Sequence, residues 1–323
     1  MANIISTALT WSQEDAAKYF LQPLFISNND LSHFDVLTNI SGSSIVLDKY
    51  SALKDVTKTL NTSDCFEADA TQSTNSNVTL TLCRLEVEHA QKAIALYNHI
   101  KSQLLRTGVQ RMDMTGTLLM EMVSEILMGA IKRDFSTILW WGKAAGGVGT
   151  QGLCDGIWEA VSGIPAGQQV AETGVVLTDL ANMMAARTNE LAAAESVIFM
   201  SRAMADAYKV ALQAAGTHVA AYAALQDGIG ELFYNGVQII VKPDWDVNIA
   251  AYGASLSAGA PTGVANTKCA MLVAKDAIAI GTDYEIQDVD MWYNRDCKEN
   301  RFRMSYSFGA ALKDSGLVVT CAQ

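Results

Sequence analysis

The longest regular pattern of apolar positions predicts a helix that ends near Trp141. Apolar residues recur at helical spacing along one face of this stretch: Leu119, Met122, Val123, Ile126, Leu127, Ala130, Ile131, Phe135, Ile138 and Leu139. Thr115 or Thr117 is a candidate N-terminal cap, and Gly142 stands just past the end. At ~1.5 Å per residue the helix would span roughly 35 Å, which is long enough to brace a whole sheet.

Before this helix the chain reads as extended, from Thr38 to about Glu88. Ser44–Tyr50 is one strand candidate, and Val78–Val87 is a cleaner one because every second residue at its start is apolar. The polar segment Asn61–Asn77 between them reads as a loop. We therefore predict a long hairpin, which could not be stable alone in water and whose open edges need a partner to cover them.

A compact turn signal lies within Glu231–Asp244. Asn235-Gly236 is the preferred two-residue turn in which both central residues need positive φ, and apolar runs rich in strand-forming residues flank it. We predict a β-hairpin here.

The remaining segments predict an α+β chain. The predicted helices are Leu177–Arg187 and one that Ser201 caps and that runs to Gly216. The predicted strands are Glu195–Met200, one or two within Cys269–Ile280, two within Met291–Phe308 around the turn Asn294–Asn300, and Gly316–Cys321. Residues 1 to about 37 have few means of building a core of their own, so we expect an arm that docks elsewhere.

Composition adds a restriction on partners. The 323 residues allow about two domains. Only 18% of them are charged, against roughly a quarter in a typical chain, so either much of the surface lies against something other than water or one large core is present. The net charge of −11 argues against a protein that grips nucleic acid, because such binding rests on Lys and Arg. It leaves open a container that holds DNA without binding it.

The six cysteines show neither a CxxC pair nor the spacing of a zinc site. The N-terminus has no secretory signal pattern, which favours reduced thiols in a cytoplasm. No uncharged apolar run reaches about 18 residues, so we expect no membrane-spanning helix.

One stretch matches a nucleotide-binding pattern. Gly147, Gly149 and Gly152 fit G-x-G-x-x-G, and Gly142-Lys143 hints at a phosphate loop. A dinucleotide fingerprint should follow a strand and open a helix, but this one follows a predicted helix. A phosphate loop needs Ser or Thr after the lysine, and Ala144 stands there. We interpret the stretch as a flexible connector.

No constellation of residues predicts catalysis. The histidines, which are His33, His89, His99 and His218, match no nucleophile motif. We place His89 and His99 in a helix, as surface or core residues. Glu86 and Glu88 alternate with Val87 as on a solvated strand face. Asp244 and Asp246 bracket Trp245 and fit a turn better than a metal loop. We predict no enzyme, and no catalytic, cofactor-binding or metal-binding residues.

Aromatic residues gather near the C-terminus, interleaved with Arg295, Arg301 and Arg303. They are Trp292, Tyr293, Phe302, Tyr306 and Phe308. Such interleaving could stack and bind nucleic acid. The acidity of the chain favours another interpretation, in which one sheet face packs on the long helix and the arginines point to solvent or to a neighbour.

Several of these motifs together resemble the major capsid proteins of tailed bacteriophages of the Hong Kong type. They are the Asn235-Gly236 hairpin, the strand that ends in Gly281-Thr282-Asp283, the long helix that ends in Trp140-Trp141-Gly142, and Leu153-Cys154-Asp155-Gly156-Ile157 after the glycine-rich loop. The order of elements fits over nearly the whole chain.

The resemblance implies a domain organisation. Residues 1–37 would be the N-terminal arm and 38–88 an extended hairpin loop that lies over a neighbouring subunit. Residues 89–159 and 286–323 would form a peripheral domain with a long spine helix. Residues 160–285 would form an axial domain with a central mixed sheet.

The resemblance also implies a structural function: many copies form hexamers and pentamers of an icosahedral shell around double-stranded DNA. Expected partners are other copies, a separate scaffold protein, a portal and decoration proteins, with assembly in the host cytoplasm. Lys49, Lys54 and Lys58 lie in the hairpin region, but nothing marks any of them as a crosslinking residue. The alternatives are an encapsulin-like compartment shell and a nucleotide-binding enzyme.

Overall fold

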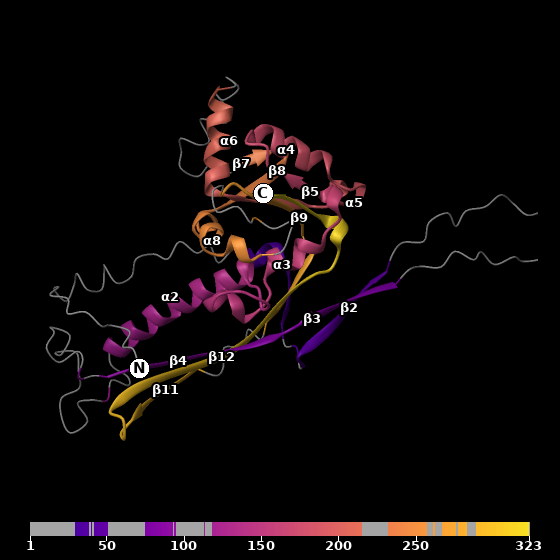
Figure 1. Cartoon of the computed structure of the whole chain (residues 1–323). Coiled ribbons are helices and arrows are strands. Elements are labelled where there is room, and N and C mark those ends of the chain that lie inside the picture. The colour runs from indigo at the N-terminus through magenta and orange to yellow at the C-terminus, as the bar shows by residue number, and fades with distance from the viewer. Residues whose placement is uncertain are drawn as a thin grey trace, which may run out of the picture.

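The computed structural model describes residues 30–38, 40, 42–50, 75–92, 94, 113, 118–214, 232–256, 261, 267–275, 277–282 and 289–322. These residues form an elongated α+β molecule, with one sheet in the upper half of Figure 1 and another below it. A two-stranded hairpin extends from the lower half, away from both sheets (Figure 1).

The lower sheet, called here the long sheet, is built around the 14-residue strand β12. Its strands are β1 (Asp35–Thr38), β4 (Cys83–Gln91), β10 (Ile278–Thr282), β11 (Val289–Asn294) and β12 (Glu299–Leu312). Along one edge β12 pairs antiparallel with β4, and it also pairs antiparallel with β10 and β11; β1 runs parallel to β10. Consecutive pairing of β11 and β12 confirms the two strands predicted within Met291–Phe308.

Helix α2 (Leu118–Trp141) lies along the long sheet and covers one of its faces (Figure 1). Leu127 and Ile131 of the helix pack on Phe302 and Met304 of β12. The end of the predicted helix is confirmed at Trp141, and the predicted caps Thr115 and Thr117 lie outside the described residues. The apolar stripe marks the side of the helix that packs on the sheet at Leu127 and Ile131, whereas every side chain from Ser136 to Trp141 is buried.

The upper sheet has six strands in the order β5-β13-β9-β6-β8-β7. They are β5 (Gln169–Ala171), β6 (Ser196–Ser201), β7 (Leu232–Tyr234), β8 (Val237–Lys242), β9 (Ala270–Ala274) and β13 (Val318–Ala322). The pairs β13–β5 and β6–β8 are parallel and the others antiparallel, so the predicted mixed sheet is confirmed. Asn235 and Gly236 both have positive φ, 48° and 81°, which confirms the predicted turn between β7 and β8.

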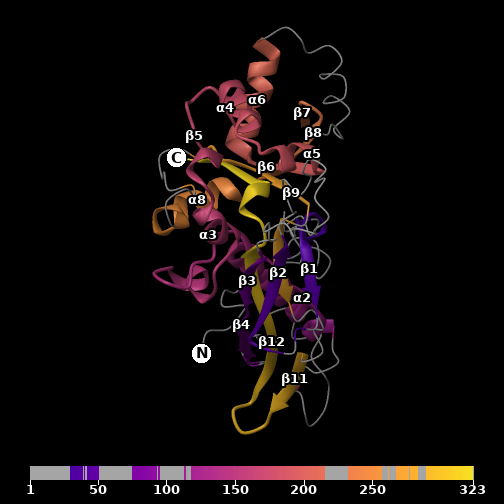
Figure 2. The ribbon, with the colours of Figure 1, turned by 90° about the vertical axis from the view of Figure 1, so that its right-hand side faces the viewer.

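Short helices surround the six-stranded sheet (Figure 2). They are α3 (Ile157–Ala160), α4 (Val176–Ala185), α5 (Asn189–Ala193), α6 (Arg202–Ala214) and α8 (Trp245–Tyr252). The 3-10 turns are η1 (Asp30–His33), η4 (Gly149–Leu153), η5 (Val161–Gly163), η6 (Ala166–Gln168), η7 (Gly253–Ser255) and η8 (Ser315–Leu317). Met204 N donates a hydrogen bond to Ser201 Oγ at 3.4 Å, so the predicted cap of α6 is confirmed.

A cluster of aromatic side chains joins the two halves, and we call it the tryptophan junction. Its members are Trp140, Trp141, Trp158, Trp245, Phe199 and Phe34. The four tryptophans and Phe199 are fully buried. Neighbouring rings lie 4.9–6.0 Å apart, mostly edge to face, the arrangement that aromatic pairs prefer. The junction brings together α2, α3, α8 and β6.

Phe34 shows how the end of the predicted N-terminal arm is held. It is 5% exposed and its ring stacks on Phe199 at 5.5 Å. The strand β1 that follows pairs with β10. Residues 30–38 therefore dock onto both halves, and residues 1–29 lie outside the described part of the chain.

Three predictions about local structure are wrong. The stretch Val78–Val87 is two strands, β3 (Asn75–Thr81) and β4, because the chain changes partner at Leu82 from β2 (Ser44–Tyr50) to β12. His89 lies in strand β4 and not in a helix, because β12 pairs with that segment. Cys83 and Cys154 form a disulfide, so the expectation of reduced thiols fails for this pair.

Candidate assembly surfaces

The glycine-rich loop after α2 begins and ends at neighbouring backbone positions. Gly156 N donates a hydrogen bond to the Gly142 carbonyl at 2.9 Å, and Ala144 N donates one to Asp155 Oδ1 at 2.8 Å. These bonds make the loop a fixed connector and not a flexible one. Since helix α2 precedes it, the order of strand, loop and helix that a dinucleotide site needs is missing.

The glycines of this loop serve backbone packing. A Cβ on Gly147 would lie 2.8 Å from Gly152 Cα, and one on Gly142 would lie 2.2 Å from the Cys154 carbonyl oxygen. Gly142 and Gly147 are therefore needed for close packing of the loop backbone, whereas Gly149 has positive φ, 58°, and no atom within 4 Å of an added Cβ. The nucleotide-binding alternative predicted a strand before this loop, and that prediction is wrong.

The aspartates around Trp245 hold secondary structure. Ala203 N donates to the Asp246 carboxylate at 3.2 Å, so Asp246 caps the first turn of α6 from another element. Burial raises the pKa of Asp246, and the hydrogen bond from Ala203 opposes that rise. Ser136 Oγ donates to Asp244 Oδ2 at 3.3 Å. The turn interpretation is confirmed for Asp244, whereas Asp246 lies in the first turn of helix α8.

Histidine and cysteine side chains do not converge on a reactive site in the part of the chain that the structure describes. The ring of His33 lies edge-on to Phe199 at 5.8 Å, and His89 is half-buried on β4. Burial raises the pKa of the Cys321 thiol to about 12 and that of Cys269 well above its usual value, which keeps both thiols unreactive. Among the described residues no group of three or more His, Cys, Asp and Glu side chains could hold a metal ion.

The face of the long sheet opposite α2 is charged. Arg303 on β12 forms ion pairs with Glu86 and with Glu88 on β4, the second at 3.7 Å. Arg301 pairs with Glu299 at 2.7 Å, and this hydrogen bond raises the pKa of Arg301. The predicted arrangement is confirmed: alternate residues Phe302 and Met304 of the same strand pack on the helix, while the arginines lie on the other side.

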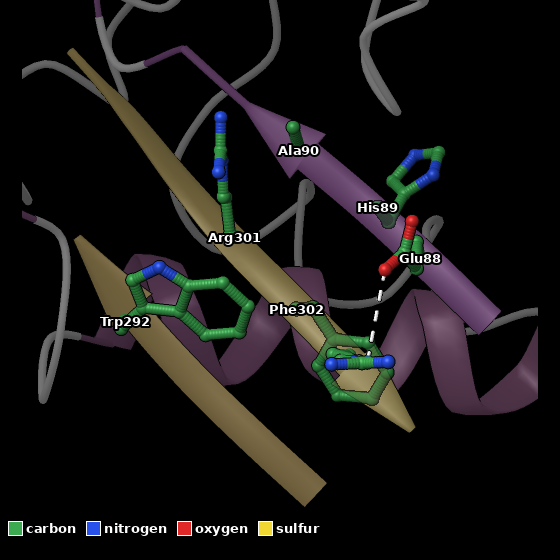
Figure 3. Close-up of a pocket in the computed structure, with 7 residues that line it drawn as sticks. Glu88, His89, Ala90, Trp292, Arg301 and Phe302 are labelled. Carbon is green, nitrogen blue, oxygen red and sulfur yellow. Dashed lines mark ion pairs between the residues drawn. The ribbon is translucent and has the colours of Figure 1, made fainter. Parts of the chain in front are cut away.

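Figure 3 shows an open depression on this end of the long sheet, with a volume of about 520 Å³. Trp292 on β11, 40% exposed, lies beside Arg301, its cross-strand partner. The remaining lining residues are Glu88, His89, Ala90, Phe302 and Arg303. Since carboxylates on the same strands pair with both arginines, the depression offers a mixed-charge contact and not a phosphate-binding groove.

Among the described strands, β2 and β3 form a two-stranded sheet of their own and pair with no other strand. Its seven residue pairs run from Ser44–Thr81 to Tyr50–Asn75. β3 continues the line of β4 and carries the hairpin beyond the long sheet (Figure 1). A two-stranded sheet is at best marginally stable in water, so this hairpin needs further contacts.

One face of the hairpin is apolar, and its burial decreases outward. Leu80, near the long sheet, is fully buried, whereas Ile45, Leu47 and Val78 are only half-buried. Val46 on the opposite face is 56% exposed. The hairpin therefore carries apolar side chains that its own subunit covers only in part.

No helix of the described residues is long and apolar enough to cross a membrane. Of the candidate crosslinking lysines, Lys54 and Lys58 lie outside the described residues.

No protein-family model matches the sequence, and no curated protein matches it. Solved structures do match. The capsid of cyanophage Pam1 is 11% identical with a TM-score of 0.57, over 99% of this chain and 95% of that chain. The capsid of Ralstonia phage GP4 is 9% identical with a TM-score of 0.57, over 99% and 92%. The encapsulin complex of Synechococcus elongatus is 10% identical with a TM-score of 0.54, over 97% and 96%.

The chain has the capsid-protein fold. The predicted tailed-phage capsid fold, with its long helix, extended hairpin and mixed sheet, is thereby confirmed over nearly the full length. The encapsulin shares this fold. Function does not follow from fold alone, so it has to be argued from the surfaces just described.

Proposed function

We propose that this chain is the major capsid protein of a tailed double-stranded DNA bacteriophage, many copies of which form the hexamers and pentamers of an icosahedral shell. One observation carries the proposal. In a chain with the capsid-protein fold, the β2–β3 hairpin presents an apolar face that its own subunit covers only near Leu80.

A neighbouring copy is the natural cover for this face. Half-buried Ile45, Leu47 and Val78 would each gain burial of apolar area, at roughly 25 cal/mol per Å². The open strand edges of the hairpin would also be protected from uncontrolled pairing. Obligate interfaces of this kind commonly bury 2,000–5,000 Å² or more, which fits a chain with only 18% charged residues.

The charge distribution supports a container. The net charge is −11, and Arg301 and Arg303 on the sheet face are paired with glutamates. A wall of this kind would repel DNA more than bind it, so packaged DNA would stay mobile. We propose that the shell encloses DNA without sequence-specific binding.

The domain organisation implied by the resemblance remains our proposal: 1–37 as an arm, 38–88 as the hairpin loop, 89–159 and 286–323 as the peripheral domain and 160–285 as the axial domain. The long sheet with α2 supports a peripheral domain, and the six-stranded sheet supports an axial one. Two strands cross the proposed bounds: β10, within 160–285, pairs in the long sheet, and β13, within 286–323, pairs in the six-stranded sheet.

Partners other than copies of the chain are part of the same proposal. A separate scaffold protein would direct closure, a portal would occupy one vertex, and decoration proteins would bind the finished shell. Assembly would take place in the host cytoplasm and the product would be the virion capsid. The tests of these partners are co-expression and copurification with candidate genes from the same genome.

An encapsulin-like compartment shell is the second candidate, favoured by the encapsulin match at a TM-score of 0.54. Both candidates use the same subunit contacts. They differ in contents, since a phage shell holds double-stranded DNA and an encapsulin-like shell holds a protein cargo.

The first experiment is sedimentation and negative-stain microscopy of the chain expressed alone and with candidate scaffold proteins. Hollow shells, or free rings of five or six subunits, are the expected products. Val78→Glu, on the half-buried apolar face of the hairpin, should prevent them while leaving a folded subunit. Val247→Glu, an equal change at a 71% exposed position of α8, is the matched control and should assemble.

If the chain remained a soluble monomer of 34.7 kDa under crowding and with scaffold present, that result would contradict the capsid proposal. Assembly of the Val78→Glu variant at the wild-type level would contradict the role given to the apolar face of the hairpin. Nucleic acid or protein inside particles isolated from the natural host separates the two candidates.

A further inference from the structure

The root of the hairpin is the point where one strand changes partner. Up to Thr81 the chain pairs with β2, and from Cys83 onward it pairs with β12. Leu82 belongs to neither strand, but its N donates a hydrogen bond to the Ser43 carbonyl at 2.8 Å. Any swing of the hairpin relative to the long sheet must therefore turn about residues 81–83.

This root packs closely on two strands of the long sheet. A Cβ on Gly309 of β12 would lie 2.3 Å from the Thr81 carbonyl oxygen. A Cβ on Gly281 of β10 would lie 2.7 Å from Leu82 Cδ2 and 2.9 Å from Leu80 Cδ2. Backbone and side chains thus meet without spare space, and contact on this side resists bending.

The disulfide holds the root from the other side. Cys83 is the first residue of β4, and its partner Cys154 follows η4 in the connection between α2 and α3. Their Cα atoms are 5.9 Å apart across a sequence separation of 71. Cys154 is 2% exposed, whereas Cys83 is half-buried.

The segment that carries Cys154 is itself fixed. Gly156 N donates to the Gly142 carbonyl at 2.9 Å, and Trp158 in the next helix belongs to the tryptophan junction. A Cβ on Gly156 would lie 2.4 Å from the Ile138 carbonyl oxygen. The disulfide therefore ties the root to a segment that hydrogen bonds and close backbone packing hold beside the tryptophan junction.

We propose that the Cys83–Cys154 pair is a redox-controlled lock on the hairpin: as a dithiol it lets the hairpin swing at residues 81–83, and as a disulfide it holds the hairpin in one direction. Its timing rests on the proposed function. Subunits that assemble in a reducing cytoplasm would carry the dithiol, and shells released to oxidising surroundings would close the lock.

The chemistry needs a low-molecular-weight disulfide such as oxidised glutathione. The half-buried Cys83 is the accessible partner, so its thiolate attacks the small disulfide, forms a mixed disulfide and releases one small thiolate. Cys154, after losing its proton, attacks the Cys83 sulfur and releases the second. Two protein thiols are oxidised, one small disulfide is reduced to two thiols, and the two protons end on the departing thiolates.

The test is hydrogen exchange of the full-length wild-type subunit in glutathione buffers that are either fully reducing or fully oxidising. Mass spectrometry first establishes the state of Cys83 and Cys154. In the oxidised form, exchange at Leu82 and in β3 should slow by about tenfold relative to the dithiol form. The double variant Cys83→Ser/Cys154→Ser should show fast exchange in both buffers, and Cys297→Ser, at an exposed free cysteine, should respond like wild type.

Equal exchange at the root in the two wild-type forms, or failure of the pair to oxidise, would overturn the lock. Both readouts use the unassembled wild-type chain, so a folding defect in the double variant does not affect them. Redox-dependent exchange in a chain that forms no shells supports the lock and counts against the capsid proposal alone. Shells that form from a chain without such exchange would retain the capsid proposal and remove the lock.

Discussion

The tryptophan junction and the β2–β3 hairpin represent opposite ways of holding a segment in place. In the junction, four fully buried tryptophans from three helices contact one another and Phe199. In the hairpin, two strands pair only with each other, and their apolar face is fully covered only at Leu80. One region is complete within a single chain and the other is not.

Under the proposed function, this difference separates the contacts used for folding from those used for assembly. Buried aromatic contacts stabilise the subunit before any partner arrives. Half-buried residues of the hairpin leave part of their apolar area exposed in the subunit, and this part remains available to a neighbour. The predictions below test this division from the largest expected effect to the smallest.

The largest effect is expected inside the junction. Trp245→Ala should lower the free energy of unfolding by about 3–5 kcal/mol, because it leaves a large cavity between α2 and α8. The Nε1–H of Trp245 has no hydrogen-bond partner among the described residues, so the loss reports packing. Urea denaturation followed by circular dichroism measures it. Trp292→Ala, at a 40% exposed position, is the control and should cost less than about 1 kcal/mol; equal losses would contradict the comparison.

Within the hairpin the effect should depend on distance from the root. Leu80→Ala should cost about 2–4 kcal/mol because Leu80 is fully buried against the long sheet. Leu47→Ala, the same change at a half-buried position farther out, should cost about 1 kcal/mol or less in the subunit. In assembled particles the two losses should become similar if a neighbour covers Leu47. Denaturation of subunits and of particles gives both numbers, and an unchanged ratio after assembly argues against that cover.

Overpacking the root gives an intermediate effect. Gly309→Ala places a Cβ 2.3 Å from the Thr81 carbonyl oxygen, which must move, and we expect a loss of about 1–3 kcal/mol. Hydrogen exchange should rise in β3 and stay unchanged in the six-stranded sheet. Gly163→Ala is the matched control, since nothing lies within 4 Å of its added Cβ. A Gly309→Ala variant with wild-type stability would show that the root is loose.

The smallest effect concerns Tyr306, a residue of β12 whose ring lies beside Phe135 of α2. Burial raises the pKa of Tyr306 to about 12 from its usual 10.0. The unfolded chain therefore loses this proton first, so the free energy of unfolding falls as pH rises from 10.0 to about 12. Tyr306→Phe should remove this part of the pH dependence. Urea denaturation over that range checks it, and equal slopes in the two proteins would contradict a buried, neutral phenol.

Local patterns were sufficient where a single element determines its own structure. The apolar stripe from Leu119 to Leu139 predicted α2, because a helix on a flat sheet buries one face whatever the sheet contains. Asn235-Gly236 predicted its turn because both residues tolerate positive φ. The alternation around Phe302 and Met304 predicted which strand face meets the helix.

Prediction failed where a distant segment decides the structure. Apolar residues alternate at Val78, Leu80 and Leu82 and then shift by one position to Leu85 and Val87, and we predicted one strand across both runs. The chain instead changes partner at Leu82, because β2 ends there and β12 begins to pair. His89 was assigned to a helix because nothing nearby shows that β12 lies beside it. Cys83 and Cys154 carry no shared spacing signal, and only the fold brings them within bonding distance.

By itself the sequence determined the α+β class, the long helix, the tight turn and an acidic chain unsuited to binding nucleic acid, because these depend on side-chain period, backbone preference and charge. Tertiary structure alone decided that four tryptophans from three helices form one junction, that the glycine-rich loop packs on itself, and that a disulfide holds the root of the hairpin. Such contacts join residues far apart in the chain. Their free energy depends on the positions of both partners, which no local pattern contains.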